Sequence, residues 1–328
     1  MSLNPVFTGV CTALVTPFTN DKVDLKALDV LIERQIEAGV PALLLCGTTG
    51  EPSTLSDTEW TLVLRHAVER INGRAVVIAG TGSNNLLHTL EKARIAKDLG
   101  ADAQLCVTPY YNKTTQAGLV AFFTRIADSA DLPVILYNVP SRTGLNMLPE
   151  TVERLSHHAN IAGIKEAGGS LSAMAELMRL CRLPLYCGND EISVSALRLG
   201  ASGLISVLSN LVPDEVVKLH RDVVLGNIQA AEARHGALKK LTDALFIETS
   251  PAPVKEALAL CGLCQADVRL PLVRMQTENL HILKTAMQEK GLLNRCNPSS
   301  FQAHAAAWDG KSPPFAHNTI SASPPVST

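Results

Sequence analysis

The amino-acid sequence predicts an α/β protein, a (β/α)8 TIM barrel with a C-terminal helical extension. Eight short apolar segments alternate with amphipathic segments over about 210 residues, as expected of a parallel barrel. The apolar segments are nearly continuous, which is typical of strands buried on both faces. The alternative, a doubly wound open sheet, needs a glycine-rich turn after its first strand, where this chain has Thr16-Pro-Phe-Thr-Asn20. The barrel is therefore the predicted fold.

Each predicted strand is a run of apolar and β-branched residues. The eight runs cover residues 10–14, 42–46, 75–79, 103–107, 133–137, 161–165, 184–187 and 203–207. Helix-capping residues lie between them. Asp24 suits the N-cap of a helix over 25–38. Ser56 and Glu59 form a capping box ahead of a helix over 60–70. The other helix start and stop signals are Gly39, Asn84 or Asn85, Gly100, Pro149 and Pro213.

More helix-like sequence follows the eighth strand than one closing helix needs. The periodic stretches are 214–225, 230–246, 254–260 and 272–290. Beyond residue 293, prolines, serines and alanines dominate, a composition typical of disordered segments. The sequence therefore predicts three parts: a catalytic barrel over 1–225, a helical domain over 226–293 and a disordered tail over 294–328.

Composition limits the partners to expect. A formal net charge of −2 gives no electrostatic reason to expect nucleic acid or an anionic membrane. No apolar run approaches the roughly 20 residues that cross a bilayer, and the N-terminus lacks the basic region of a signal peptide. Four of the eight cysteines fall in predicted strands, where free thiols pack as small apolar groups. Cys261 and Cys264 have the CxxC spacing but no second pair to complete a zinc site. We expect a cytoplasmic protein without a metal.

Hydroxyl and charged residues gather at the C-terminal ends of the predicted strands, where barrel enzymes have their active sites. These ends are 47–51 (GTTGE), 108–112 (TPYYN), 137–144 (YNVPSRTG), Lys165 and 188–190 (GND). Three of the four tyrosines lie at two of these ends. Core packing alone does not explain this concentration at one rim. The rim is therefore the predicted site.

Lys165 ends the sixth predicted strand. Burial favours the neutral form of an amine, and a neutral amine attacks carbonyl carbons to form a Schiff base. The alternative is a lysine that reaches water along its stem or pairs with Glu166. Because successive side chains in a strand point to opposite faces, we expect Glu166 to point away from Lys165. Schiff-base chemistry is the favoured interpretation.

The other rim residues suit the same chemistry. No histidine lies at a strand end, so the sequence predicts neither a metal site nor a Ser-His-Asp triad. The hydroxyls of Thr48, Thr49 and Tyr137 can pass protons, and Arg142 suits a carboxylate. Each also has a structural alternative, as a turn threonine, a core aromatic or the partner of a surface carboxylate. Together they predict a lysine enzyme acting on a small keto acid.

These motifs resemble those of the 4-hydroxy-tetrahydrodipicolinate synthase (dihydrodipicolinate synthase) family. The matching runs are 47–51 (GTTGE), 109–112 (PYYN), 137–144 (YNVPSRTG), 163–167 (GIKEA), 205–207 (ISV) and 251–255 (PAPVK). The resemblance extends from about residue 7 to residue 293. The wider pyruvate Schiff-base lyase and aldolase superfamily shares the barrel, the lysine and a GxTGE run. The SRTG run with its arginine is more specific to the synthase branch.

The resemblance implies an enzyme of lysine biosynthesis by the diaminopimelate route, which condenses pyruvate with L-aspartate 4-semialdehyde. It assigns Lys165 to the Schiff base and Tyr137 to general acid and base catalysis. It further implies a proton relay through Thr49 and through Tyr111, the latter reaching in from a neighbouring subunit.

The resemblance also implies how the substrates are held. Arg142 is expected to bind the carboxylate of the semialdehyde, Thr48 and Thr49 to position that of pyruvate, and the backbone of Ile205 to line the pocket. No dissociable cofactor is implied. Family members are usually homotetramers built as dimers of dimers.

Lysine-inhibited family members resemble one another at a further site near the dimer interface. It maps here onto Ser53, Asp57, Trp60, Asn84, His88 and Tyr110. Those members favour histidines where this chain has Asp57 and Trp60, and a glutamate where it has His88. Because an acidic partner for the ammonium of lysine is lost, we expect weak or absent feedback, with Asp57 the one carboxylate that could replace it.

Two other functions fit the sequence less well. A related pyruvate-dependent lyase acting on a sugar acid or another 2-keto-3-deoxy acid needs small or neutral hydroxyl-binding groups where this chain has Arg142. A non-catalytic binding relative predicts the loss of Lys165 or Tyr137, and the chain has both.

Overall fold

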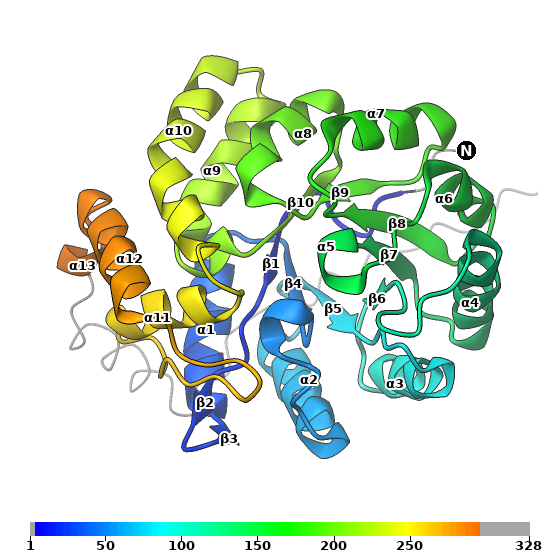
Figure 1. Cartoon of the computed structure of the whole chain (residues 1–328), viewed down its shortest axis with the longest axis horizontal. Coiled ribbons are helices and arrows are strands. Elements are labelled where there is room, and N and C mark those ends of the chain that lie inside the picture. Colours follow the sequence, from blue (N-terminus) through cyan, green and yellow to red (C-terminus); the bar gives the residue numbers. More distant parts are fainter. Residues whose placement is uncertain (1–3, 296–328) are drawn as a thin grey trace, which may run out of the picture.

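The computed structural model describes residues 4–295 and has a closed barrel of eight parallel strands at its centre, ringed by helices (Figure 1). The strands follow the order β1-β10-β9-β8-β7-β6-β5-β4, with β1 closing against β4. They are β1 (Gly9–Ala13), β4 (Ala42–Leu45), β5 (Val76–Gly80), β6 (Ala103–Val107), β7 (Val134–Asn138), β8 (Ile161–Glu166), β9 (Leu185–Cys187) and β10 (Gly203–Ser206). The predicted barrel is confirmed, with every strand boundary within one residue of its predicted position.

The helices between the strands pack on the outside of the barrel. They are α1 (Leu25–Glu37), α2 (Asp57–Ile71), α3 (Leu86–Asp98), α4 (Gln116–Ser129), α5 (Pro140–Thr143), α6 (Pro149–Ser156), α7 (Leu171–Leu180), α8 (Ser193–Leu199) and α9 (Pro213–Val224). Asp24 caps α1, and Ser56 with Glu59 forms the predicted capping box. Because Ser56 is the N-cap, α2 begins at Asp57 and not at residue 60 as predicted. Asn85 caps α3.

Two apolar clusters hold the barrel together. The inner one fills the barrel interior and includes Cys11, Leu105, Tyr137 and Ile205, and the outer one joins the strands to the helices. Within the inner cluster the rings of Phe7 and Tyr186 stack with centroids 4.3 Å apart, and the Tyr186 phenol donates to the carbonyl of Phe7. The free thiols at strand positions are buried, in agreement with an apolar packing role.

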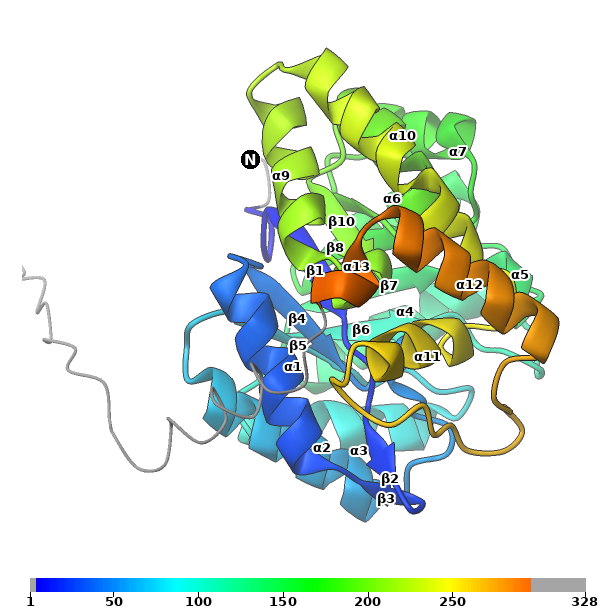
Figure 2. The same cartoon turned by 90° about the vertical axis from the view of Figure 1, so that its left-hand side faces the viewer.

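The C-terminal helices form a group beside α9, on one side of the barrel (Figures 1 and 2). They are α10 (Ile228–Leu245), α11 (Ala252–Leu260), α12 (Thr277–Glu289) and α13 (Leu292–Arg295). The helical extension is thus confirmed, while most of the predicted disordered tail, from residue 296 onward, lies outside the described residues. Within the described residues, no helix is both long and apolar enough to span a bilayer.

Two further features differ from the prediction. The helix predicted over 272–290 begins only at Thr277, with Gln276 as its N-cap. Arg269 donates its N–H to Glu51 at 3.1 Å, and Gln276 donates to Glu248 at 3.0 Å. The sequence reading also missed a short hairpin of β2 (Phe18–Thr19) and β3 (Lys22–Val23), whose strands are too short for a periodic pattern.

Arg269 fixes this irregular segment to the barrel. Its guanidinium binds Glu59 at 2.6 Å and Asp21 at 2.9 Å, donates to the carbonyl of Thr54, and lies over the ring of Phe18. The hydrogen bond from Arg269 lowers the pKa of Glu59 to about 2. The segment between α11 and α12 is therefore bound to the hairpin and to α2 by charge.

This pair makes stability depend on pH in the acid range. A carboxylate with a lowered pKa stabilises the fold above its unfolded pKa, and the contribution is lost as pH falls from about 4.5 towards 2. We expect Glu59→Gln to lower the free energy of unfolding by about 1 kcal/mol at pH 7, after allowing for solvent screening. Urea titrations at pH 7 and pH 2.5 should show the difference shrinking at low pH. Glu289→Gln, which breaks the exposed pair with Lys240, is the control. An equal loss from Glu59→Gln at both pH values contradicts this account.

Candidate active site

Lys165 and Tyr137 form the centre of the site. They are register partners on the adjacent strands β8 and β7, near the C-terminal ends of both. The Lys165 ammonium lies 4.3 Å from the centroid of the Tyr137 ring, and each residue is 6% exposed. The structure thus places the amine and the phenol side by side at this rim.

Glu166 does not share the environment of Lys165. Its carboxylate accepts hydrogen bonds from the Asn138 side chain at 2.9 Å and from the backbone of Gly168 at 2.6 Å. Burial raises the pKa of Glu166. It forms no ion pair with Lys165 within residues 4–295, so the expected strand alternation holds. The amine is thus left without a carboxylate partner from its own strand.

Small residues make room for the Lys165 side chain. A Cβ atom at Gly188, at the end of β9, would lie 2.8 Å from Cε of Lys165 and 2.7 Å from Cβ of Ala167. The carboxylate of Asp190 lies on the same loop and accepts from the backbone N–H groups of Val207 and Leu208, each at 2.9 Å. Burial raises the pKa of Asp190. The loop after β9 therefore gives the lysine space.

The two threonines lie on a tight turn after β4. Thr48 to Gly50 form a single 3-10 turn (η1), and the residue that ends it, Glu51, has a left-handed backbone with φ 53°. Thr49 is buried. The turn packs closely against β5, where a Cβ at Gly80 would lie 2.1 Å from the carbonyl oxygen of Cys46. Both threonines are therefore turn residues, and the turn also brings Thr48 to the pocket described next.

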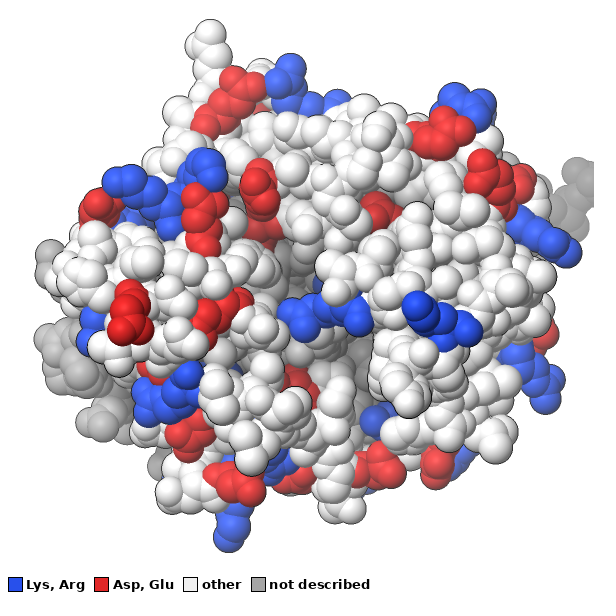
Figure 3. Space-filling view, in the orientation of Figure 1, with Lys and Arg blue, Asp and Glu red and all other residues white. Residues whose placement is uncertain are grey.

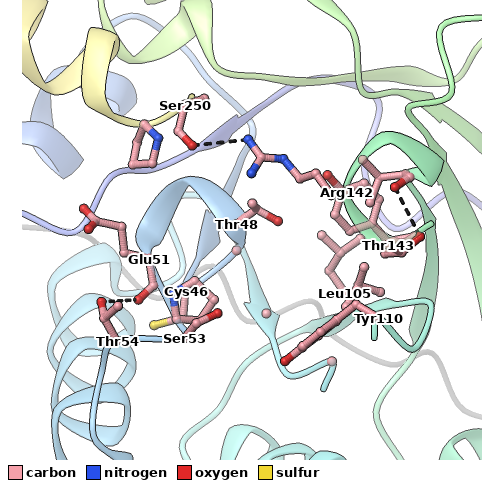
Figure 4. Close-up of a pocket in the computed structure, with 18 of the residues that line it drawn as sticks. Cys46, Thr48, Glu51, Ser53, Thr54, Leu105, Tyr110, Arg142, Thr143 and Ser250 are labelled. Carbon is pink, nitrogen blue, oxygen red and sulfur yellow. Dashed lines mark hydrogen bonds between the residues drawn. The ribbon is translucent and has the colours of Figure 1, made fainter. Parts of the chain in front are cut away.

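A pocket of about 280 Å³ opens beside this turn (Figure 4). Its lining includes Thr48, Tyr110, Tyr137 and Arg142, four of the predicted site residues. The space-filling view shows a hollow at the centre of this face with basic side chains at its edge (Figure 3). A basic edge attracts anionic substrates such as keto acids.

Four of the predicted catalytic and substrate-binding residues do not line this pocket: Lys165, Thr49, Tyr111 and Ile205. Thr49 is buried behind Thr48, and Ile205 belongs to the inner apolar cluster together with Tyr137. Tyr111 is 92% exposed, with a left-handed φ of 68°. Within residues 4–295 the Tyr137 phenol makes no hydrogen bond to Thr49 or Tyr111. A single chain therefore does not assemble the proton relay implied by the resemblance.

Arg142 lies on α5 and reaches across the pocket (Figure 4). Its Nη2 donates to the backbone carbonyl of Ser250 at 3.2 Å, from the start of the helical extension. The sequence analysis missed Ser250, which precedes the matched run 251–255. The structural alternative for Arg142, a pair with a surface carboxylate, is not seen among residues 4–295, and its side chain lines the pocket (Figure 4).

The candidate lysine-binding residues lie along α2, α3 and the pocket wall. Ser53 and Tyr110 line the pocket, Trp60 is buried, and the carbonyl of Asn84 accepts from Asn112. Asp57 is occupied by His88, whose Nε2 lies 3.0 Å from it, and this hydrogen bond lowers the pKa of Asp57.

Across residues 4–295, no group of three or more histidine, cysteine, aspartate or glutamate side chains is arranged to hold a metal ion. Cys264 is a free thiol. Burial raises the pKa of Cys264 to about 12, opposite to the shift that makes a thiol reactive.

A buried amine beside a phenol, at the C-terminal end of a (β/α)8 barrel, is the arrangement of a lyase that forms a Schiff base with its substrate. The comparisons with known proteins identify the family. The chain belongs to the dihydrodipicolinate synthetase family, whose model matches residues 6–290.

Relatives with assigned names agree over nearly the whole length of the family model. The chain is 48% identical over 290 residues to the 4-hydroxy-tetrahydrodipicolinate synthase of Geobacter sulfurreducens, covering 88% of this chain and 100% of that protein. It is 46% identical over 296 residues to that of Thermoanaerobacter sp. (strain X514), covering 89% and 100%. The solved dihydrodipicolinate synthase of Thermotoga maritima is 39% identical, with a TM-score of 0.86 and coverage of 88% of this chain and 99% of that one.

Proposed function

We propose that this protein is a 4-hydroxy-tetrahydrodipicolinate synthase, which condenses pyruvate with L-aspartate 4-semialdehyde in the diaminopimelate route to lysine. The observation that carries the proposal is the register pairing of Lys165 with Tyr137, with the ammonium 4.3 Å from the ring centroid. The names of the relatives support the choice of substrates.

In the proposed reaction the neutral Nζ of Lys165 attacks the ketone carbon of pyruvate, and the ketone oxygen leaves as water. The resulting imine loses a proton from its methyl group to give an enamine, whose carbon attacks the aldehyde of the second substrate. The phenol of Tyr137 lies beside Nζ and is suited to carry protons to and from these atoms. The amino group of the added semialdehyde then attacks the imine carbon, which closes the ring and breaks the bond to Nζ, so that Lys165 leaves as the free amine. The chain itself supplies each group, without a dissociable cofactor.

The two carboxylates take different partners in this proposal. The turn that carries Thr48 and Thr49 offers hydroxyls to the carboxylate of pyruvate. The Arg142 guanidinium, anchored on Ser250 at 3.2 Å, binds that of the semialdehyde. We also propose that the backbone of Ile205, which lies in the inner apolar cluster together with Tyr137, contacts the bound pyruvate. The barrel over 1–225 thus supplies the reacting groups, and the helical domain over 226–293 braces them.

Tyr111 supports a catalytic unit of more than one chain. An aromatic side chain that is 92% exposed on a left-handed loop position is suited to bury itself against a second copy. We propose that Tyr111 completes the relay of Thr49 and Tyr137 in a neighbouring subunit, within a cytoplasmic homotetramer built from dimers. One similar solved structure is described as a monomeric dihydrodipicolinate synthase variant, so assembly needs its own measurement, such as light scattering.

Two assays test the proposal together. Borohydride reduction in the presence of pyruvate should add one reduced pyruvyl group, mapped to Lys165 by mass spectrometry. A coupled assay should then find turnover with L-aspartate 4-semialdehyde and none with sugar-acid aldehydes such as glyceraldehyde. If Lys165 carries the adduct but only the sugar-acid aldehyde is turned over, the enzyme is a sugar-acid lyase of the same superfamily. Absence of the adduct rejects the mechanism.

We expect lysine to be a weak inhibitor. Its ammonium needs a free carboxylate, and Asp57 is already paired with His88 and lies 3.8 Å from the ammonium of Lys92. Sub-millimolar lysine should leave the condensation rate nearly unchanged. His88→Glu both adds a carboxylate and frees Asp57, so this variant should become more sensitive. Strong inhibition of the unmodified enzyme by sub-millimolar lysine contradicts the prediction.

A further inference from the structure

A buried ion pair joins the helical extension to the threonine turn. Nζ of Lys255, on α11, lies 2.5 Å from Oε1 of Glu51, the residue that ends the turn. The side chains are 0% and 1% exposed. Nζ also donates to the carbonyl of Asp267 at 2.7 Å and lies 4.0 Å from the centroid of the Phe18 ring. The ammonium is therefore fully enclosed by groups that hold it in one place.

The second oxygen of Glu51 is held by the same part of the chain. Oε2 accepts the backbone N–H of Arg269 at 3.1 Å. Both carboxylate oxygens thus bind the helical extension, although Glu51 itself follows β4 in the barrel. The neighbouring Arg269 side chain is fixed by its own ion pairs with Glu59 and Asp21. The groups of the helical extension that bind Glu51 are therefore themselves held in place.

Glu51 needs such an anchor because of its backbone. Its φ of 53° lies in the left-handed region, which residues other than glycine seldom adopt, and Cys46 at the other end of the turn has the same φ. Unfavourable backbone conformations persist only where the surroundings impose them. The residues between these two ends include Thr48 and Thr49, so a constraint on Glu51 also constrains the threonine hydroxyls.

We propose that Lys255 is a positioning residue for the reaction, which holds the Thr48–Thr49 turn in its pyruvate-binding conformation through Glu51. The proposal rests on the function proposed above, in which this turn binds the pyruvate carboxylate. The same short stretch of chain also holds Arg142 through the carbonyl of Ser250. The start of α11 therefore braces opposite walls of the pocket, and the helical extension is part of the catalytic apparatus.

A plain structural role is the rival explanation, and variants can separate the two. Lys255→Met removes the ammonium and leaves Glu51 buried without its partner, so a second variant, Lys255→Met with Glu51→Gln, removes both charges and relieves that penalty. Arg274→Met is the matched control. It breaks the pair between Arg274 and Glu256, which also joins the segment after α11 to α11 but does not contact the turn.

The test measures pyruvate trapping and backbone hydrogen exchange on the full chain. In both Lys255 variants we expect the pyruvate concentration for half-maximal borohydride trapping to rise about 10- to 100-fold. We also expect faster amide exchange in residues 47–54. The KM for the semialdehyde should change little, because Arg142 keeps its contact with Ser250. Arg274→Met should change none of these values, even where it lowers the melting temperature.

The outcomes distinguish this proposal from the function on which it rests. Unmodified protein that traps pyruvate but does not turn over the semialdehyde rejects the proposed function and leaves the trapping comparison valid. If the unmodified protein traps no pyruvate, the rate of amide exchange in residues 47–54 is the only test of the positioning role. The positioning role is rejected if amide exchange in residues 47–54 is as slow in both Lys255 variants as in the unmodified protein. It is also rejected if the doubly substituted protein traps pyruvate at the same concentration as the unmodified protein.

Discussion

Lys165→Met is expected to abolish the reduced pyruvyl adduct and to lower the condensation rate roughly 10³-fold or more. The amine is the atom that bonds to pyruvate, and within residues 4–295 no other lysine lies on a barrel strand. Methionine fills a similar volume without a charge, and Lys165 has no carboxylate partner on its own strand that would be left unpaired. The melting temperature should therefore stay close to that of the unmodified protein.

Intact-protein mass spectrometry after borohydride reduction measures the adduct, and the coupled assay measures the rate. Lys218→Met is the control, because Lys218 lies on the exposed face of α9 in a surface pair with Asp214 and should leave both readouts unchanged. An adduct that persists in Lys165→Met and maps to another lysine, such as Lys113, rules out the assignment of the nucleophile.

The barrel could be predicted from the sequence because its signals are local. Each strand is a continuous apolar run, and each boundary lies within one residue of its predicted position. Parallel register then brings strand ends together, which explains why Lys165 and Tyr137 could be expected to meet. The helix predicted from residue 272 begins only at Thr277, because apolar spacing alone does not mark the N-cap, here Gln276.

What the sequence could not predict is contact between remote segments. Glu51 and Lys255 each lie in a recognised motif, yet no spacing rule relates two residues 204 positions apart. The same holds for Arg142 and Ser250, which are 108 positions apart. Periodicity describes one element at a time, and these pairs arise only when the extension packs on the barrel. The contacts of the helical extension with the pocket could therefore not be predicted from sequence motifs.

Tyr111 marks a different limit. The sequence motif places it beside Tyr110, and the fold carries Tyr110 to the pocket wall while Tyr111 is 92% exposed. A residue that acts in a neighbouring subunit leaves no trace in the contacts of its own chain. Its predicted role thus depends on assembly, whereas the roles of Lys165 and Tyr137 do not.

The role of Tyr137 gives the second large effect. Tyr137→Phe should slow condensation by about 10²- to 10⁴-fold, because the variant lacks the hydroxyl of a ring that lies 4.3 Å from the Lys165 amine and that we propose carries its protons. The variant should unfold with nearly unchanged free energy. Within residues 4–295 the phenol makes no hydrogen bond, and phenylalanine keeps the ring beneath the ammonium.

Tyr186→Phe is the matched control, since it removes a second buried phenol of the barrel, one whose hydroxyl binds the backbone of Phe7. That phenol donates to the carbonyl of Phe7 at 3.1 Å, and burial raises the pKa of Tyr186 to about 12. Losing the bond should lower the free energy of unfolding by about 1 kcal/mol and leave the condensation rate intact. Tyr137→Phe is therefore expected to change the condensation rate but not the stability, and Tyr186→Phe the stability but not the rate. A Tyr137→Phe enzyme with normal condensation, measured beside a destabilised Tyr186→Phe protein, would show that the proton passes through another group.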